Sequence, residues 1–503
     1  MTLSFYRRGE EMVQKFISME NICKNFGGVK ALKGASLQIN KGEVHCLAGE
    51  NGSGKSTIIK VLSGVHKPES GKIIIDDQEY TEMKPSEAIK QGIQIIYQDF
   101  SIFPNLTVRE NLALNKILLD GKKLVTKKDF DVIAKEAIAK IGFEVDLDEL
   151  VENLSVADKQ LVAISRALLD DAKLIVMDEP TTALTKKEVD RLFDIIRRLV
   201  AEDVTILFVS HKLDEVFEIC DRITVFRNGE NVITLPISDM TEEKFSFYMT
   251  GRDLKYEQSH YEKNIGDTVL ELKGLTGKNF SDIDFSIKKG EIVGITGHLG
   301  NGRSELTQTL FGLLQPTSGE VYIDGEKVII ENPKRAQDLG IALVPEDRLT
   351  EGLFLPMSIK TNATAAMIDK YANSLGIINR KKVIEKSREA INQFSIATTD
   401  EDQAVGALSG GNQQKVLLSR WIDTQPKILI LNGPTAGVDI GAKHDIYKVL
   451  KTLSLAGVAI IIGSDDMREI TQNCDRVEVM TDGKIITTLQ KEELTPEILS
   501  NYM

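Results

Sequence analysis

The chain has 503 residues, of which 42% are hydrophobic and 27% are charged. This length exceeds what one ordinary core fills and allows about two to four domains. The formal net charge of -13 disfavours phosphate backbones and anionic lipid as main partners, so we expect no nucleic-acid partner. No apolar run approaches the roughly 20 residues that span a bilayer, and the first residues lack the apolar core of a secretory signal. We therefore expect a cytosolic protein that can dock onto a membrane partner.

The first elements in chain order are two strand-like segments, EVHCLAG at 43–49 and KIIID at 72–76. A helix-rich middle follows at 108–119 and 127–142. The late runs KLIVMD at 173–178 and TILFVS at 205–210 are apolar and bounded by turns, as in strands buried on both faces. The sequence therefore predicts an α/β fold with a mostly parallel sheet and an inserted helical region.

The chain also repeats itself. KGEVHCLAGENGSGKST at 41–57 is echoed by KGEIVGITGHLGNGRSE at 289–305, and the LSVADKQ segment starting at 154 is echoed by LSGGNQQ starting at 408. Collinear order at near-constant spacing indicates two homologous domains. We predict an N-terminal extension at 1–15, a first domain at 16–252, a short polar linker at 253–267 and a second domain at 268–503.

Four cysteines are scattered along the chain without CxxC pairing: Cys23, Cys46, Cys220 and Cys474. This pattern argues against a zinc site or a disulfide framework. Buried reduced thiols are the better interpretation.

A phosphate-binding loop lies between the first strand and a helix, and fits G-x-x-x-x-G-K-[ST]. Its glycines let backbone N–H groups curl around phosphates, Lys55 reaches the β- and γ-phosphates, and Ser56 can ligate Mg²⁺. The strand and helix flanks disfavour the alternative of an ordinary turn. The predicted nucleotide-binding residues here are Gly49, Glu50, Asn51, Gly52, Ser53, Gly54, Lys55, Ser56 and Thr57.

An acidic pair ends the strand LIVMD. Asp178 is placed to hold a metal with its water shell, and Glu179 to polarise an attacking water. Such a pair is often only a helix N-cap, and a lone histidine such as His211 is more often structural than catalytic. The position of these residues downstream of a phosphate-binding loop favours the functional interpretation.

Together these motifs resemble ATP-binding cassette (ABC) ATPases, which have a P-loop NTPase fold and use ATP and Mg²⁺. The resemblance implies that Gln98 contacts the metal and couples to a membrane partner, and that His211 contacts the γ-phosphate. It also implies that Phe26 stacks on adenine, although a core phenylalanine is the plain alternative.

The second half departs from this pattern at the corresponding functional positions. It keeps the loop residues Gly297, Gly302 and Ser304. At five functional positions the residue differs: Arg303 replaces Lys55, Glu346 replaces Gln98, Asn432–Gly433 replaces Asp178–Glu179, and Asp465 replaces His211. Asn432 is a poorer metal ligand and Gly433 cannot orient water, so this half is not expected to hydrolyse ATP with its own residues.

The signature motif shows the opposite defect. It is intact in the second half as Ser409, Gly410, Gly411 and Asn412, whereas the first half reads Ser155-Val156-Ala157-Asp158. Asp439, retained in the second half, is Thr185 in the first. In the ABC family the cassettes pair head to tail, each ATP lying between one loop and the other signature. The resemblance therefore implies intrachain pairing, with one hydrolytic site and a degenerate site, at Arg303 and Ser155, that can only hold nucleotide.

Two fused cassettes carrying VPEDR, LSGGNQQKV and PTAGVDIGAK resemble the ATPase subunits of ribose, galactose and xylose importers. This resemblance implies integral membrane permease subunits, an indirect extracytoplasmic substrate-binding partner, and a place on the cytoplasmic face of the cell membrane. Asn432–Gly433 departs from the Asp-Glu pair that these importer subunits usually carry at this position. A nucleoside or a furanose-like signalling molecule remains an alternative cargo. A soluble twin-cassette ATPase acting on ribosomes or DNA, and an inactive regulatory scaffold, are alternatives of other classes.

Overall fold

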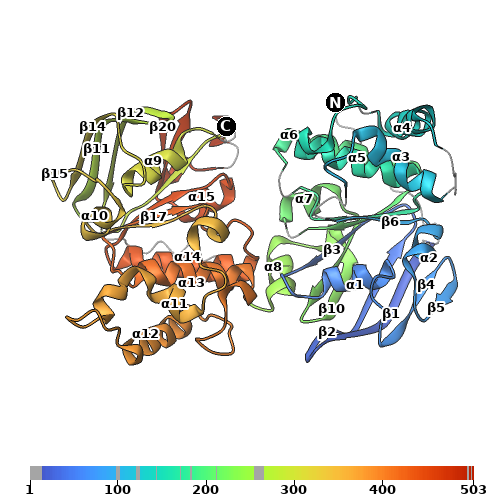
Figure 1. Ribbon diagram of the computed structural model, residues 1–503, viewed down its shortest axis with the longest axis horizontal. Coiled ribbons are helices and arrows are strands. Elements are labelled where there is room, and N and C mark those ends of the chain that lie inside the picture. The colour runs from blue at the N-terminus through green and yellow to red at the C-terminus, as the bar shows by residue number, and fades with distance from the viewer. Residues whose placement is uncertain are drawn as a thin grey trace. The chain divides into compact units, whose positions relative to one another are not determined.

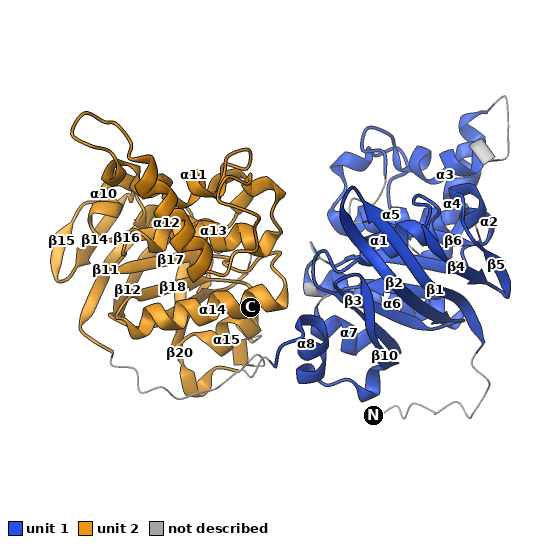
Figure 2. Cartoon of the chain, turned by 90° about the horizontal axis from the view of Figure 1, so that it is seen from below, with its two compact units in different colours: residues 1–255 blue, residues 256–503 orange. Residues whose placement is uncertain are grey.

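The computed structural model describes residues 14–97, 102–119, 125–142, 144–169, 171–181, 184–210, 212–253, 265–298, 300–495, 498–499 and 501–502. The chain forms two compact units, Met1–Lys255 and Tyr256–Met503, shown in separate colours in Figure 2. The division falls inside the segment predicted to be a linker. Each unit has its own core, and each is described here by itself.

The central sheet of unit 1 has six strands in the order β10-β9-β3-β8-β7-β6. All neighbours are parallel except β10, which pairs antiparallel with β9. The side chains of Ile206–Val209 are 0% exposed, as expected for a parallel strand covered on both faces. The strands are β3 (Val44–Gly49), β6 (Ile93–Ile96), β7 (Leu174–Asp178), β8 (Thr205–Val209), β9 (Arg222–Arg227) and β10 (Glu230–Pro236).

A second, antiparallel sheet of unit 1 has the order β2-β1-β4-β5. It contains the strand predicted at 72–76, which the sequence did not separate from the parallel sheet. One apolar cluster packs between the two sheets and includes Ile58 and Leu62 of the helix that follows β3. The strands are β1 (Lys15–Phe26), β2 (Val29–Asn40), β4 (Ser70–Ile75) and β5 (Gln78–Tyr80).

The predicted helical region of unit 1 consists of α3, α4 and α5, which contact one another (Figure 1). In α4, buried Ala134, Ala137 and Ile141 recur at helical spacing, and Gly142 ends the helix in the left-handed region. The helices of the unit are α1 (Lys55–Leu62), α2 (Pro85–Lys90), α3 (Val108–Leu119), α4 (Lys127–Ile141), η1 (Val151–Asn153), α5 (Val156–Leu169), α6 (Lys186–Ala201), α7 (Leu213–Ile219), η2 (Ile237–Asp239) and α8 (Glu242–Thr250).

Unit 2 repeats this architecture with sheets β12-β11-β14-β15 and β16-β17-β18-β13-β19-β20. Its strands are β11 (Thr268–Gly277), β12 (Phe280–Lys288), β13 (Ile292–Thr296), β14 (Ser318–Ile323), β15 (Glu326–Val328), β16 (Ile341–Val344), β17 (Ile428–Asn432), β18 (Ala459–Gly463), β19 (Arg476–Thr481) and β20 (Lys484–Gln490). Its helices are α9 (Arg303–Leu310), α10 (Pro333–Asp338), η3 (Arg348–Gly352), α11 (Ile359–Thr364), η4 (Ala365–Tyr371), α12 (Arg380–Gln393), η5 (Val405–Ala407), α13 (Gly410–Ile422), α14 (Ile440–Leu455), α15 (Met467–Asn473) and η6 (Lys491–Glu493).

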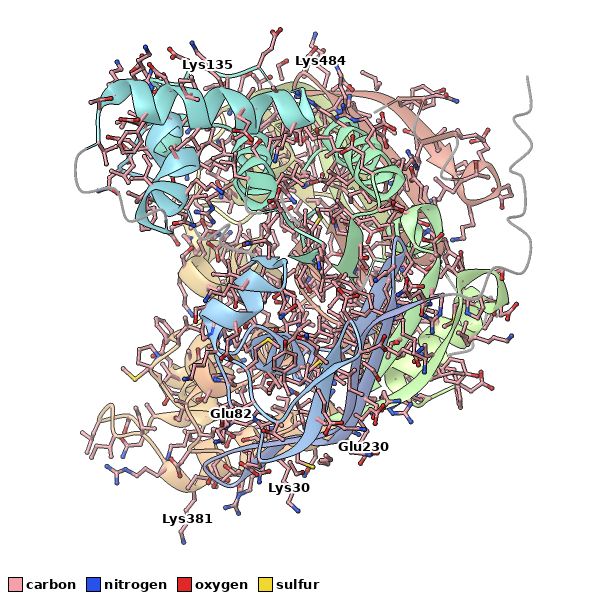
Figure 3. All side chains as sticks on the ribbon, turned by 90° about the vertical axis from the view of Figure 1, so that its right-hand side faces the viewer. Lys30, Glu82, Lys135, Glu230, Lys381 and Lys484 are labelled. Atoms are coloured by element: carbon pink, nitrogen blue, oxygen red, sulfur yellow. The ribbon has the colours of Figure 1, made fainter. Side chains whose placement is uncertain are left out.

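The surface carries side chains of both charge signs, such as exposed Lys30, Glu82 and Lys381 (Figure 3). Within the described ranges, no helix has the length and apolar character needed to cross a bilayer. The four cysteines are free thiols, and three of them are buried while Cys23 is half-buried.

Candidate nucleotide-binding sites

The predicted site residues of unit 1 lie at the carboxyl ends of parallel strands of one sheet. The phosphate-binding loop follows β3, Asp178 ends β7, and β8 lies between those two strands. Asp178 pairs in register with Val209 at the end of β8, and Leu47 near the end of β3 pairs with Val209 as well. Parallel strands bring such residues to one edge of the sheet, where α/β proteins bind ligands.

The loop from Gly49 to Gly54 joins β3 to α1. Gly54 caps α1 with φ 108°, and a Cβ there would lie 3.0 Å from the carbonyl oxygen of Ala31. Only glycine fits this conformation and this close approach. The buried hydroxyl of Ser53 has no hydrogen-bond partner among the described residues, which suits a loop built to meet a ligand.

Lys55 lies folded against this loop. Its Nζ donates to the carbonyl oxygens of Gly49, at 2.7 Å, and Glu50, at 3.1 Å. Burial lowers the pKa of Lys55, and the charges of Glu179 and Asp178 oppose that shift. A buried ammonium held by neutral carbonyls is ready to exchange them for phosphate oxygens.

Asp178 and Glu179 do not cap a helix, since α6 begins only at Lys186 and is capped by Thr185. Burial raises the pKa of Asp178, and the adjacent charge of Glu179 raises it further. Two carboxylates in this position favour a cation, and exposed Ser56 at the start of α1 offers a hydroxyl oxygen. The described donors therefore fit Mg²⁺, which prefers oxygen ligands.

Glu179 adopts φ 48°, in the left-handed region, and its N–H donates to the carbonyl oxygen of Val209 at 3.0 Å. A non-glycine residue there costs about 1–2 kcal/mol. Such strain often marks functional positions.

Phe26 is 43% exposed at the end of β1, so it is not a core residue. Its ring meets the His66 ring edge-on, with centroids 5.0 Å apart, and Lys24 Nζ lies 5.4 Å from its centroid. An exposed ring held in place by a neighbour is available for stacking.

Gln98 and His211 lie outside the described residues. The strands that precede them, β6 and β8, belong to the same sheet and run in the same direction as β7.

A network that the sequence reasoning missed joins the acidic strand end to the end of β8. Thr181 Oγ1 donates to Glu215 Oε2 at 2.6 Å, and Ser210 Oγ donates to the same oxygen at 3.2 Å. Unit 2 repeats it with Thr435, Ser464 and Glu469. Recurrence at a constant offset of 254 residues was the signal that could have found it.

The loop of unit 2 keeps the backbone of the first loop. Gly302 caps α9 with φ 90°, and a Cβ there would lie 2.1 Å from the carbonyl oxygen of Asn279. A Cβ at Gly297 would lie 2.0 Å from a carbonyl oxygen of β19. Arg303, 5% exposed, is held differently from Lys55: its Nη1 pairs with Asp465 Oδ1 at 2.6 Å.

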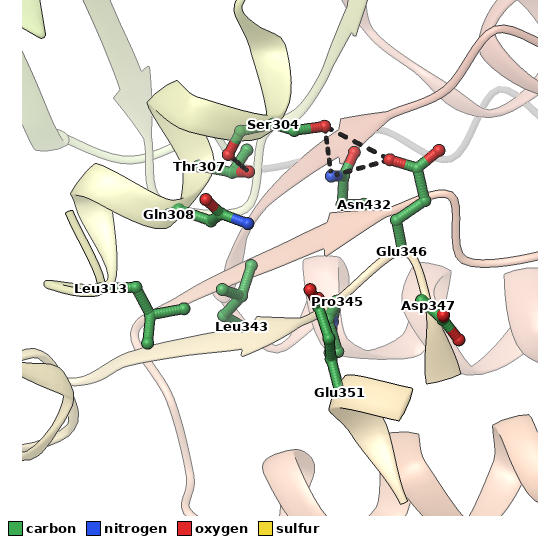
Figure 4. Close-up of a pocket in the computed structure, with 10 residues that line it drawn as sticks. All are labelled: Ser304, Thr307, Gln308, Leu313, Leu343, Pro345, Glu346, Asp347, Glu351 and Asn432. Carbon is green, nitrogen blue, oxygen red and sulfur yellow. Dashed lines mark hydrogen bonds between the residues drawn. The ribbon is translucent and has the colours of Figure 1, made fainter. Parts of the chain in front are cut away.

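Beside this loop three side chains bond to one another (Figure 4). Asn432 Nδ2 donates to Ser304 Oγ at 3.0 Å and to Glu346 Oε2 at 3.3 Å, and Ser304 Oγ donates to Glu346 Oε2 at 3.3 Å. They line a cavity of about 360 Å³, whose other side includes Leu313 and Leu343. An amide donor and a hydroxyl already in use do not fit Mg²⁺.

The two signature segments each begin a helix. Ser409 caps α13, and both the N–H and the side-chain amide of Asn412 donate to its hydroxyl, the latter at 2.9 Å. In unit 1 the Ser155 hydroxyl instead donates to the Asp158 carboxylate at 2.8 Å. A carboxylate therefore stands beside the serine in unit 1 and a neutral amide in unit 2.

Close packing explains the small residues of the second signature. A Cβ at Gly410 would lie 2.7 Å from Arg348 Nη2, and a Cβ at Gly411 would lie 2.6 Å from the Cβ of Ala442 and 3.3 Å from Asp439 Oδ2. Asp439 caps α14 by accepting from the Ala442 N–H at 2.8 Å.

Two homologous units with these loops and signatures define a twin ATP-binding cassette. The sequence model of the ABC transporter family matches residues 32–182 and 280–436, more than half of the chain. The chain therefore belongs to the ABC transporter family.

Particular relatives are similar over almost the full length. The ribose import ATP-binding protein RbsA of Clostridium tetani is 41% identical over 492 residues, covering 97% of each chain. Two proteins of Halalkalibacterium halodurans are 40% identical and cover 97% of this chain. One is a putative ribose/galactose/methyl galactoside import ATP-binding protein, of which 93% is covered, and the other is a ribose import ATP-binding protein, of which 98% is covered.

Proposed function

We propose that this protein is the ATP-hydrolysing subunit of an importer that couples ATP binding and hydrolysis to uptake of a monosaccharide through a separate permease. The observation that carries the proposal is that Lys55, Asp178 and Glu179 lie together at the edge of the unit 1 sheet. Burial lowers the pKa of Lys55 and raises the pKa of Asp178, whereas the charges of the two carboxylates oppose the shift of Lys55 and the charge of Lys55 opposes the shift of Asp178. The import ATP-binding relatives, about 40% identical over nearly the whole chain, support the transport role.

The first loop binds the phosphate chain through its backbone N–H groups, with Lys55 and the orphaned Ser53 hydroxyl as side-chain donors. Glu179, whose backbone is left-handed, accepts a proton from the water that attacks the terminal phosphate. His211 contacts that phosphate. Mg²⁺, held by Ser56 and Asp178 together with Gln98, would neutralise phosphate charge when bound.

The second unit completes this hydrolytic site in the proposal. Ser409 and the Gly410–Gly411 turn place N–H and hydroxyl donors at the start of α13, a helix end that suits a terminal phosphate. Asp439 faces the same site, and Asn412 holds the Ser409 hydroxyl without adding negative charge. The complementary defects of the two halves support this intrachain pairing.

The adenine of the bound nucleotide stacks on Phe26 in the proposal. The ring is exposed, and the edge-on contact with His66 orients it, so stacking needs little ordering of the side chain.

The partners are integral membrane permease subunits and, indirectly, an extracytoplasmic substrate-binding protein. The chain would lie on the cytoplasmic face of the cell membrane as a peripheral subunit. A monosaccharide is the favoured cargo because the relatives are ribose and galactose import proteins, and a nucleoside or furanose-like molecule is the alternative. A ligand screen on the cognate binding protein identifies the cargo.

Copurification together with an ATPase assay tests the class of function. We expect a tagged chain to bring down an integral membrane protein, and the purified chain to hydrolyse ATP at a rate that Glu179→Gln abolishes. Bound RNA or DNA in place of a membrane protein would contradict transport. Identical residual activity of the wild type and Glu179→Gln would show an inactive scaffold.

A further inference from the structure

The side chain of Asn432 bridges groups of opposite charge beside the second loop. It ends β17, is 4% exposed, and donates through Nδ2 to Ser304 and to the Glu346 carboxylate (Figure 4). Its Oδ1 is buried and has no hydrogen-bond partner among the described residues, and neither has Arg303 Nε.

These two buried atoms face the same small space. A Cβ added at Gly463 would lie 2.8 Å from Asn432 Oδ1 and 3.1 Å from Arg303 Nε. With the guanidinium on one side and a carboxylate on the other, the amide dipole is most stable with oxygen toward the cation and nitrogen toward the anion. The surrounding charges therefore hold the amide with its N–H groups toward Ser304 and Glu346.

This orientation presents a donor where unit 1 presents a carboxylate. Asp178 ends β7 as Asn432 ends β17, and Ser56 is the second residue of α1 as Ser304 is the second residue of α9. Mg²⁺ needs oxygen ligands in near-octahedral geometry and repels N–H donors. A cation here would break the bonds among Ser304, Glu346 and Asn432 and would meet an amide that Arg303 holds in the wrong orientation.

The positive charge of the second loop is also already neutralised. Arg303 Nη1 lies 2.6 Å from Asp465 Oδ1, whereas Lys55 Nζ donates to the carbonyl oxygens of Gly49 and Glu50. Asp465 is 42% exposed, and exposed Glu346 adds a second carboxylate nearby. Without a divalent cation, a third phosphate would add charge against two carboxylates.

We propose that the second phosphate-binding loop holds a nucleoside diphosphate without a divalent cation. This inference rests on one part of the proposed function, namely that the second loop still binds phosphates. Gly300 and Gly302 keep the positive φ values of such a loop. The nucleotide at the second loop therefore stays bound while the first loop binds and hydrolyses ATP with Mg²⁺.

Equilibrium binding to the full chain tests this. The Lys55→Ala variant, which disables the first loop, is titrated with ADP and ATP in Mg²⁺ and in excess chelator. We expect the ADP dissociation constant to change by less than about twofold on chelation, because metal and nucleotide are uncoupled, whereas coupled ligands differ by about 5- to 150-fold. We expect ATP to bind at least about tenfold more weakly than ADP. Loss of ADP binding in chelator, or equal binding of ATP, overturns the proposal.

Two further measurements locate the effect. Asn432→Asp in the same background restores a carboxylate, so we expect Mg²⁺ to tighten nucleotide binding by about tenfold, and no gain would contradict the role of the amide. Adding Arg303→Ala should weaken the binding seen with Lys55→Ala, and unchanged binding would place the nucleotide elsewhere. The wild-type chain should keep one ADP in chelator and bind two in Mg²⁺, and none in chelator overturns the proposal. Its ATPase activity tests the first loop separately.

Discussion

The ends of β7 and β17 occupy the same place in the two units and carry different chemistry. At both ends the next residue is left-handed, with φ 48° at Glu179 and 57° at Gly433, and its N–H bonds to the neighbouring strand, at 3.0 Å and 2.7 Å. Glycine adopts this conformation freely, whereas glutamate is strained by about 1–2 kcal/mol. Both units keep this backbone conformation, but the strained glutamate occurs only in unit 1, where we propose that its carboxylate serves the reaction.

The largest expected effect comes from breaking that difference at Glu179. Glu179→Gln keeps the shape of the side chain but removes the carboxylate that we propose as the base, so we expect ATP turnover to fall by about 100-fold or more. A steady-state ATPase assay measures it. Gly433→Ala is the matched change in unit 2 and should leave turnover near the wild-type rate. A similar loss from both substitutions would mean that both strand ends serve hydrolysis.

The signature serines give a second matched pair. Each hydroxyl accepts from an N–H three residues on, so Ser409→Ala and Ser155→Ala should cost similar stability, about 1 kcal/mol. Only Ser409 is proposed to meet the hydrolysed ATP, and losing a hydrogen bond to a charged group should lower turnover by about tenfold. ATPase and thermal unfolding of both variants separate the two effects. An equal loss of turnover would sink the proposed pairing of the first loop with the second signature.

The smallest expected effect is on stability. Glu179→Gly should raise the free energy of unfolding of unit 1 by about 1 kcal/mol, because the relief of strain outweighs the added flexibility of glycine. Gly433→Ala should lower the free energy of unfolding of unit 2 by about 1 kcal/mol, because alanine is strained at the left-handed φ of 57°. A clash adds nothing to this cost, since the new Cβ would make an ordinary contact, 3.4 Å from Glu346 Cγ. Urea unfolding measures both, and the fluorescence of Trp421, the chain's one tryptophan, reports on unit 2. A lower free energy of unfolding for Glu179→Gly than for the wild type would show that position 179 is not strained.

The apolar runs of β3, β7 and β8 could be predicted because strands covered on both faces need continuous hydrophobic sequence. The antiparallel sheet could not be separated from them, since short strands such as β4 carry the same residues whichever partner they pair with. The P-loop and acidic strand end were recognisable because their chemistry lies in contiguous residues. Gln98 and His211 remain predictions.

The contacts of the second loop were beyond the sequence. Arg303 and Asp465 lie 162 residues apart, and Asn432 lies 128 residues from Ser304. Each replacement looked like the loss of a function. The structure shows that the residues that replace those of unit 1 bond to one another, Arg303 to Asp465 and Asn432 to Glu346.

The most direct test of the central claim, that one of the two loops supports hydrolysis, is the ATPase rate of Lys55→Ala beside that of Arg303→Ala. Lys55 donates to loop carbonyl oxygens that phosphate oxygens can replace, whereas Arg303 is paired with the Asp465 carboxylate. We predict that Lys55→Ala abolishes turnover and that Arg303→Ala keeps a sizeable fraction of it. Equal loss from the two substitutions would contradict the asymmetry of the two sites.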